Sequence, residues 1–292
     1  MGVFRTFLFA PANHPRRVEK SFGLGADAII LDLEDACAIS EKVASRQKVV
    51  EAMSGPRNCL GYVRVNPLGT DFGFGDIYET VRPGLDGIVL PKVESAADLL
   101  TADWMIRNLE RERGLPVGGI DLLPIVETGL GLANLREILG CDTRVRRVAF
   151  GAGDFCLDMN LQWSRNEEEL LPYRSRVVLM SRSAGKEPPI DTVWININDT
   201  EGFSASARRS LQLGFQGKLC IHPDQVPVVN EVFTPTSEQV ARARRLVDAF
   251  AAAEAQGSSS FQLDGQFIDY PIVYAAEKLL RIHEKITGQR QG

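Results

Sequence analysis

The sequence predicts an α/β fold, a (β/α)₈ barrel that is followed by a C-terminal helical extension. Short apolar runs rich in β-branched residues recur along the chain, and such runs are typical of parallel strands that are covered on both faces. Segments with helical periodicity lie between them, so strands and helices alternate as in a closed barrel. An open, doubly wound sheet is the alternative. It fits less well because Ala12-Asn13-His14-Pro15 stands where a glycine-rich dinucleotide-binding turn would follow the first strand.

The eight predicted strands are, in chain order, Arg5–Ala12, Ala28–Glu34, Leu60–Asn66, Gly87–Val93, Leu122–Glu127, Arg147–Gly151, Thr192–Asn198 and Lys218–His222. The helices predicted between them include Ser40–Met53, Ser95–Gly114, Leu130–Leu139, Glu167–Ser183 and Ser204–Gly214. Two of these helices have clear start signals, because Ser40 precedes Glu41 and Ser95 precedes a first turn that contains Asp98.

The barrel is predicted to span residues 1–235 and the extension residues 236–292. Thr236–Gln256 is an Ala-, Arg- and Glu-rich amphipathic segment, which we expect to be a helix. Gly257-Ser258-Ser259-Ser260 is typical of a linker, and a last helix is predicted from Val273 to Thr287. So small an appendage has too little core to be an independent domain, and we expect it to pack on the barrel of its own chain or of a neighbouring subunit.

Composition and charge limit the class of partner. A net charge of −5 argues against a nucleic-acid or anionic-membrane binder, and no apolar run approaches the roughly 18 residues that span a bilayer. The opening Met1-Gly2-Val3-Phe4-Arg5 lacks the pattern of a secretory signal. The five widely spaced cysteines favour reduced thiols in a cytoplasmic protein, and the three scattered histidines argue against a zinc cluster.

Polar residues gather at the C-terminal ends of the predicted strands. They are Asp32, Glu34, Asp35, Arg64, Asn66, Lys92, Glu127, Asp154, Asn198, Asp199 and His222. The active sites of barrel enzymes lie at this face, so the convergence predicts a site for a polar ligand.

Glu127 and Asp154 end two consecutive strands and are the strongest candidates for metal ligands. A carboxylate at the end of an apolar strand is costly to bury unless it is paired or bound to a metal. On neighbouring strands the two could share one Mg²⁺, a hard cation that prefers oxygen ligands. The structural alternative is that Asp154 caps the following helix and Glu127 pairs with an arginine.

Three further residues of the rim have candidate roles. Strand alternation directs Glu34 into the barrel mouth, where it could hold a metal-bound water, position a base or simply cap a helix. Arg64 lies between two valines and needs an anionic partner, which could be a substrate carboxylate, a developing enolate or Glu34. Lys92 is a Schiff-base candidate, although a metal site would offer another electron sink. A Cys156–His222 pair has no local support.

Seven sequence blocks resemble, in the right order, the HpcH/HpaI aldolase–citrate lyase β-subunit superfamily and, within it, the acyl-CoA ester lyases. The blocks are Ala26-Asp27-Ala28-Ile29-Ile30-Leu31-Asp32-Leu33-Glu34-Asp35-Ala36, Arg64-Val65-Asn66, Leu90-Pro91-Lys92-Val93, Ile125-Val126-Glu127-Thr128, Phe150-Gly151-Ala152-Gly153-Asp154, Gly217-Lys218-Leu219-Cys220-Ile221-His222-Pro223-Asp224-Gln225 and Asp264-Gly265-Gln266-Phe267-Ile268-Asp269-Tyr270-Pro271. Together they span nearly the whole chain.

The resemblance implies a TIM barrel with Mg²⁺ on Glu127 and Asp154 and a thioester substrate that contacts Arg64. It also implies a homotrimer, or a dimer of trimers, in which the C-terminal segment laps over a neighbouring active site. The catalytic aspartate of that segment best matches Asp269, with Asp264 as the fallback. The residues that follow Asp154 are bulkier than the resemblance suggests, which puts the size of the substrate in doubt.

The expected reaction is Mg²⁺-dependent carbon–carbon cleavage of a 3-hydroxy-carboxyacyl-CoA, such as malyl-, citramalyl- or citryl-CoA, to acetyl-CoA and a 2-oxo acid. Arg64 would stabilise the enolate, Asp269 would act as general acid or base, and Glu34 would organise the site. The substrate and CoA would be bound by Arg64, Asn66 and the basic residues of the first βα loop, namely Arg16, Arg17 and Lys20. A malyl-CoA thioesterase, a CoA-independent pyruvate aldolase and a citrate lyase β subunit that acts within a complex on a carrier-bound thioester remain alternatives.

Overall fold

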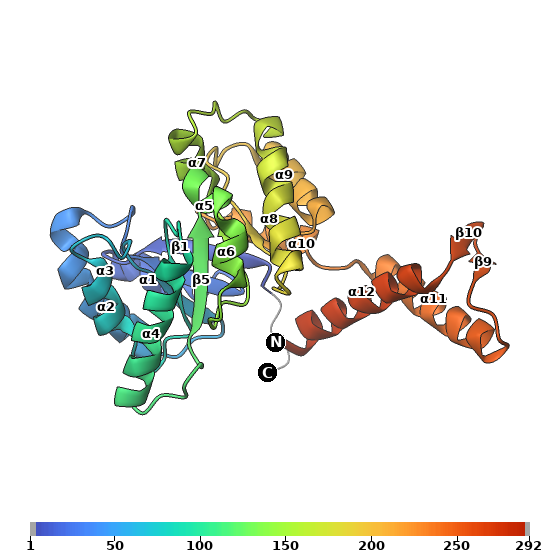
Figure 1. Ribbon diagram of the computed structural model, residues 1–292, viewed down its shortest axis with the longest axis horizontal. Helices are drawn as coiled ribbons and strands as arrows, with labels where there is room; N and C mark the ends of the chain where they lie inside the picture. The colour runs from blue at the N-terminus through green and yellow to red at the C-terminus, as the bar shows by residue number, and fades with distance from the viewer. Residues whose placement is uncertain (1–3, 290–292) are drawn as a thin grey trace. The chain divides into compact units, whose positions relative to one another are not determined.

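Eight parallel strands close a barrel in the computed structural model, which describes residues 4–289 (Figure 1). The strands are β1 (Thr6–Pro11), β2 (Ala28–Asp32), β3 (Leu60–Arg64), β4 (Gly87–Leu90), β5 (Asp121–Val126), β6 (Ala149–Phe150), β7 (Ile190–Asp191) and β8 (Gly217–Cys220). Each pairs with the next, and β8 closes on β1 with Thr6 opposite Lys218. The predicted fold class is confirmed.

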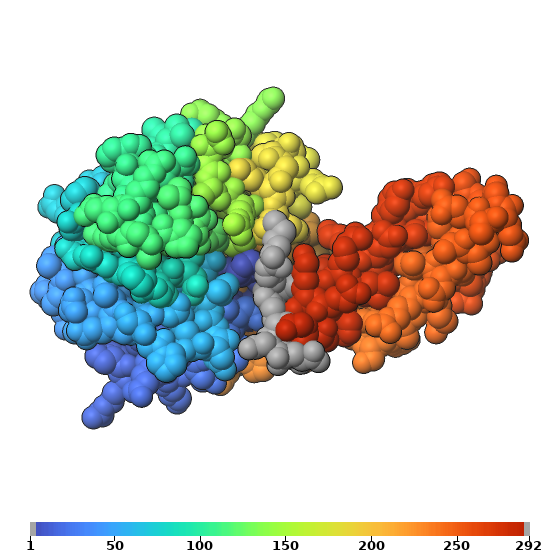
Figure 2. All heavy atoms as spheres, turned by 90° about the horizontal axis from the view of Figure 1, so that it is seen from below, coloured from blue at the N-terminus to red at the C-terminus, as the bar shows by residue number. Residues whose placement is uncertain are grey.

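Helices surround these strands. They are α1 (Pro15–Ser21), α2 (Lys42–Ser54), α3 (Gly73–Thr80), α4 (Ala96–Glu112), α5 (Gly129–Ala133), α6 (Leu135–Gly140), α7 (Ala152–Asp158), α8 (Leu171–Ser183), α9 (Thr200–Leu213) and α10 (Gln225–Val232). Short 3₁₀ turns, η1 (Ile39–Glu41) and η2 (Glu168–Leu170), lead into α2 and α8. The barrel residues, blue to yellow in Figure 2, form one continuous mass of atoms on the face shown. Within residues 4–289, no helix is long and apolar enough to cross a membrane.

The start of α4 follows the prediction, because Ser95 and Asp98 form a complete capping box. The segment predicted as one helix over Leu130–Leu139 is instead divided into α5 and α6 at Asn134, whose ψ of 5° interrupts the helix. Helices α1, α3, α7 and α10 were not predicted from the apolar periodicity.

The seventh strand differs most from the prediction. Residues 192–198 lie outside any strand, and β7 consists of Ile190 and Asp191, which pair with Gly217 and Lys218 of β8. The alternating Ile-Asn pattern suggested a strand, but Ile195 and Ile197 are exposed and pack no core. The predicted rim residue Asp199 therefore does not end a strand; its side chain caps α9 by accepting from the Gly202 N–H.

The chain divides into two compact units, one from Phe4 to Asn230 and one that begins at Glu231. The second contains α11 (Ser237–Ala255), the hairpin strands β9 (Phe261–Leu263) and β10 (Gln266–Ile268), and α12 (Tyr270–Gln289). Its core joins α11 to α12 through Leu246, Phe250, Ile268 and Val273, among others. The division predicted from the sequence lies after residue 235. Residues 1–3 of the predicted barrel and residues 290–292 of the predicted extension lie outside the described residues.

Candidate active site at the carboxyl end of the barrel

The site arises where the inward-facing series of apolar residues ends in polar ones. Along β2 the series is Ala28, Ile30 and Asp32, and β3 contributes Tyr62 and Arg64; the apolar members pack in one barrel core. Because successive inward positions of a strand are two residues apart, Glu127 also continues the inward series of Leu123 and Ile125 in β5. The barrel core thus gives way to charged side chains at its carboxyl end.

Asp32 and Arg64 lie opposite each other in the pairing of β2 with β3. The guanidinium donates from Nε to Asp32 Oδ1 at 2.8 Å and from Nη2 to Oδ2 at 2.6 Å, which is a bidentate pair. The ring of Phe9 lies 4.7 Å from the Arg64 Cζ and covers one face of the guanidinium. Burial opposes the charge of Arg64, but the carboxylates of Asp32 and Glu34 outweigh it and raise the pKa of Arg64. Arg64 is therefore a cation at every physiological pH.

Glu34 lies between two cations. Its Oε1 accepts a hydrogen bond of 2.6 Å from Lys92 Nζ, and its Oε2 lies 2.9 Å from Arg64 Nη1 as an ion pair without hydrogen-bond alignment. Burial raises the pKa of Glu34 above its ordinary value, although Arg64 and Lys92 oppose the change.

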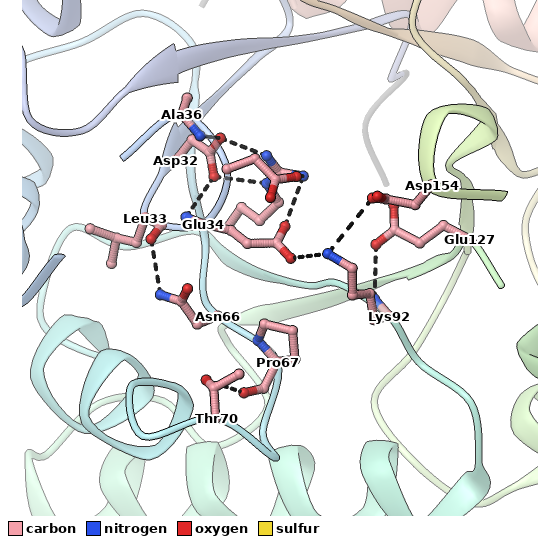
Figure 3. A network of polar contacts seen from close by, with 12 residues as sticks. Asp32, Leu33, Glu34, Ala36, Asn66, Pro67, Thr70, Lys92, Glu127 and Asp154 are labelled. Carbon is pink, nitrogen blue, oxygen red and sulfur yellow. Dashed lines mark hydrogen bonds and ion pairs between the residues drawn. The ribbon is translucent and has the colours of Figure 1, made fainter. Parts of the chain in front are cut away.

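Lys92 connects the two halves of the site (Figure 3). Its backbone N–H donates to Glu127 Oε1 at 2.9 Å, and its ammonium lies 2.6 Å from Glu34 Oε1 and 3.7 Å from Asp154 Oδ2. Lys92 adopts a φ of 51°, a left-handed conformation that is uncommon outside glycine and that often marks a functional site. Burial alone would lower the pKa of Lys92, but the hydrogen bond and charge of Glu34 raise it, so the amine is held protonated.

Glu127 and Asp154 lie together as the strand ends predicted (Figure 3). Glu127 is 3% exposed, and burial raises its pKa to about 8, with the nearby carboxylates of Glu34 and Asp154 adding to the effect. A side chain at Gly151 would collide with Glu127 Oε2, so only glycine leaves room for the carboxylate. Helix α7 begins after Gly151 without a side-chain cap, so Asp154 in its first turn is not the predicted alternative, a helix cap.

These carboxylates fit a hard divalent cation. The negative charges near Glu127 disfavour its ionised form. A bound cation would relieve this repulsion. Within residues 4–289, no group of three or more His, Cys, Asp or Glu side chains is arranged to hold a metal. Mg²⁺ matches this donor set, because it commonly binds through one or two carboxylates and completes its octahedron with water and substrate oxygens.

A cleft of about 800 Å³ opens beside Glu34 and Lys92. Its other lining residues are Asp35, Cys37, Ala38, Ile39, Lys42, Asn66, Pro67, Gly69, Thr70, Asp71 and Phe72. The Asn66 amide is fully engaged within the protein, since it donates to Leu33 O and Asp76 Oδ2 and accepts from Lys42 Nζ. Asn66 thus fixes the wall of the cleft, as Figure 3 shows for its bond to Leu33.

The other predicted residues lie elsewhere. Arg16, Arg17 and Lys20 are exposed on α1. Asp269 precedes α12 in the second compact unit, where its carbonyl accepts from the N–H groups of Ile272 and Val273.

Cys156 and His222 are not brought together as a pair. Cys156 packs in an apolar cluster of β6, α7 and α8, and burial raises the pKa of its thiol. His222 instead accepts from the backbone N–H of Asp224.

Sequence reasoning did not assign roles to Asp32, Phe9 or Lys42. The pairing of Asp32 with Arg64 depends on the register between β2 and β3, and only a correct alignment of two strands would have revealed it. The left-handed conformation of Lys92 could not be predicted from the sequence, because lysine has no preference for this region of backbone angles.

The chain is similar to known proteins over nearly its whole length. The chain is 36% identical over 282 residues to the citrate lyase subunit beta of Leuconostoc mesenteroides subsp. cremoris, which covers 95% of this chain and 92% of that protein. It is 33% identical over 307 residues to an L-malyl-CoA/beta-methylmalyl-CoA lyase of Cereibacter sphaeroides, with 97% and 96% covered. Both relatives thus match nearly the full length of the chain.

A solved structure of similar fold is the protein CitE of Mycobacterium tuberculosis in complex with magnesium, acetoacetate and coenzyme A. The TM-score is 0.77 at 29% identity, over 96% of this chain and 98% of that one. The model of the HpcH/HpaI aldolase/citrate lyase family matches residues 5–223. The chain therefore belongs to the HpcH/HpaI aldolase/citrate lyase family.

Proposed function

We propose that the protein is a Mg²⁺-dependent carbon–carbon lyase that cleaves a 3-hydroxy-carboxyacyl-CoA to acetyl-CoA and a 2-oxo acid. The observation that carries the proposal is the rim cluster in which Glu127 and Asp154 lie on one side of Lys92, and Glu34 and Arg64 on the other. The citrate lyase and malyl-CoA lyase relatives support it, as does the magnesium and coenzyme A complex of CitE. Malyl-, citramalyl- and citryl-CoA are the candidate substrates.

Glu127 and Asp154 would hold the cation. When bound, Mg²⁺ polarises the oxygens of the substrate and lowers the pKa of its hydroxyl group. The third carboxylate, Glu34, contacts Lys92 and Arg64. It would therefore orient the groups around the metal site without binding the cation itself.

Arg64 would stabilise the charge that develops as the C2–C3 bond breaks. A base takes the proton of the 3-hydroxyl group, the C–O bond becomes the carbonyl of the 2-oxo acid, and the electron pair of the broken bond passes to the thioester as an enolate. A fixed guanidinium donor directed at the enolate oxygen lowers this barrier. Protonation of the enolate at C2 then gives acetyl-CoA.

Asp269 would exchange these protons as general acid and base. Since it belongs to the second compact unit, we propose that a neighbouring subunit delivers it within a homotrimer or a dimer of trimers. We further propose that the enzyme is cytoplasmic, because its five cysteines are all free thiols.

The substrate arm would enter along the cleft beside Glu34, whose wall Asn66 fixes. Arg16 and Lys20 would bind CoA phosphates, since both are exposed cations on the first helix. These assignments place the thioester between Arg64 and the two metal-binding carboxylates.

The test is a screen of malyl-, citramalyl- and citryl-CoA with Mg²⁺, in which 2-oxo acid and free thiol are measured in parallel. A lyase releases 2-oxo acid and acetyl-CoA without free thiol. Free thiol released together with the intact 3-hydroxy acid, and without 2-oxo acid, would indicate a thioesterase, and cleavage of CoA-free substrates a pyruvate aldolase. A protein inactive on every free acyl-CoA but active on a carrier-bound thioester would be a lyase subunit of a larger complex.

A further inference from the structure

We propose that Asp32 is a positioning residue that fixes the direction of the Arg64 guanidinium, with the ring of Phe9 supporting its face. The inference rests on the proposed function in one respect, that Arg64 contacts the reacting thioester. The geometry itself does not depend on the identity of the substrate.

The Asp32 carboxylate has no acceptor position left for a ligand. Besides the two bonds from Arg64, Oδ1 accepts from the Glu34 N–H at 2.9 Å and Oδ2 from the Ala36 N–H at 3.0 Å. A carboxylate offers about four acceptor positions, and all are filled here. Asp32 is 1% exposed, so it acts on the site through the groups that it holds (Figure 3).

The bidentate bond leaves one end of the guanidinium for the site. Nε and Nη2 are bound to Asp32, while Nη1 points to the acidic edge, 2.9 Å from Glu34 Oε2 and 3.6 Å from Asp35 Oδ2. Phe9 closes one face of the planar group. Rotation of Arg64 would break two charge-assisted hydrogen bonds at once, so the donor is held in one direction.

The same carboxylate also orders Glu34. Because Asp32 accepts from the Glu34 N–H, it fixes the turn after β2 from which the Glu34 side chain reaches Lys92. Small errors in the placement of catalytic groups are costly, about 100-fold in rate for a displacement near 1 Å. One buried carboxylate thus aligns two side chains of the site.

A matched control lies at the opposite end of the barrel. Arg5 donates to Asp27 from Nε at 3.0 Å and from Nη2 at 2.6 Å, which is the same bidentate chemistry in a partly buried setting. Asp27 precedes β2 whereas Asp32 ends it. The variant Asp27→Asn therefore removes an equivalent pair far from the reaction.

The test compares Asp32→Asn with Asp27→Asn in the full-length protein. We expect Asp32→Asn to lower kcat by about 10–100-fold with little change in KM, because a misplaced Arg64 stabilises the transition state less. Asp27→Asn should lower the melting temperature and leave kcat unchanged. In the background of Arg64→Gln, Asp32→Asn should add little, because two residues that act as a unit are not additive.

A second readout needs no turnover. Phenylglyoxal modifies accessible arginines, and peptide mass spectrometry gives the rate at Arg64 itself. We expect this rate to rise severalfold in Asp32→Asn and less in Phe9→Leu, which stays apolar but loses the aromatic face. Phe9→Leu also decides the proposal if Asp32→Asn does not fold.

The proposal would be overturned if Asp32→Asn kept the wild-type kcat, or if Asp32→Asn had its full effect in the Arg64→Gln background. It would also be overturned if the modification rate at Arg64 were unchanged in both variants. A wild-type protein that releases no 2-oxo acid from any thioester would instead defeat the proposed function. In that case the modification rate still decides whether Asp32 fixes Arg64.

Discussion

The backbone N–H of Lys92 donates a hydrogen bond of 2.9 Å to Oε1 of Glu127, and the residue that donates it has a left-handed φ of 51°. This conformation lets Lys92 direct its amide to one carboxylate while its ammonium reaches Glu34. Such backbone strain, of order 1–3 kcal/mol, persists only where the surrounding contacts impose it. The end of β4 is therefore shaped around the carboxylates that follow β5 and β6.

Loss of either proposed metal ligand should abolish Mg²⁺ binding. We expect Glu127→Gln and Asp154→Asn to weaken Mg²⁺ by more than ~100-fold, since even outer-sphere changes cost 10–100-fold in metal affinity. Isothermal titration with Mg²⁺ measures this directly. Asp158→Asn is the control on the same helix, because Asp158 instead accepts from the Gly129 N–H. Unchanged affinity for Mg²⁺ in Glu127→Gln would show that Glu127 is not a metal ligand.

The stability of the metal-free protein should fall as the pH rises towards 8. Burial raises the pKa of Glu127 from its ordinary value of 4.5 to about 8. Between these values the folded chain binds more protons at Glu127 than the unfolded chain does, so the free energy of unfolding decreases with pH, by up to about 1.4 kcal/mol per pH unit.

Urea denaturation with EDTA between about pH 5 and pH 8 measures this slope. Added Mg²⁺ should flatten the slope, because the cation stabilises the ionised carboxylate. Glu127→Gln should flatten it without Mg²⁺. The same slope in wild type and Glu127→Gln would assign the effect to another group.

Lys92 should not form a Schiff base. Its ammonium is bound to Glu34 and its pKa is raised, so the neutral amine that attacks a carbonyl is scarce. We expect borohydride added with substrate to leave activity intact, and EDTA to remove it. Inactivation by borohydride with a reduced adduct on Lys92 would establish the opposite mechanism.

Asp269 should act in an active site of another subunit. Because α11 and α12 share one core, truncation within the second unit would expose apolar surface, so point variants are the sharper probe. We expect Asp269→Asn to lose at least ~100-fold in kcat, the lower end of the range for general acid–base catalysis. Asp264→Asn, at a hairpin turn with a φ of 50° that asparagine tolerates, should remain active.

Mixing two inactive variants tests the sharing between subunits. Asp269→Asn and Glu127→Gln, refolded or co-expressed together, should regain activity, since some sites then combine an intact Glu127 with an intact Asp269. No recovery in mixed oligomers of confirmed composition would place both residues in the site of one chain.

The buried ion pairs of Asp191, in β7, should contribute strongly to the free energy of unfolding. Asp191 is fully buried and binds Arg174 Nε at 2.9 Å and Lys218 Nζ at 2.7 Å. Asp191→Ala leaves two buried cations without this partner and should cost about 3–5 kcal/mol in urea denaturation. Arg165→Ala breaks an exposed, solvent-screened pair with Asp199 and should change the free energy of unfolding little. Equal losses in the two variants would contradict this role of the buried pairs.

Much of the fold could be predicted because its strands are continuous apolar runs. The residues Ala28-Ile29-Ile30-Leu31 are fully buried, and their prediction as a strand is confirmed. The seventh strand was mispredicted because Ile190 and Asp191 are too few to produce a pattern, while the exposed loop after them alternates like a strand. Local periodicity reports burial only where the alternating residues meet a core.

The sequence by itself determined which residues stand at strand ends, and thus placed Glu34, Arg64, Glu127 and Asp154 on one rim. Only the tertiary structure decided how they are held. The register of β2 with β3 sets Asp32 against Arg64, and the backbone of Lys92 turns to meet Glu127. Position along a strand is local information, whereas hydrogen-bond partners depend on neighbouring strands that the chain brings together only when the barrel closes.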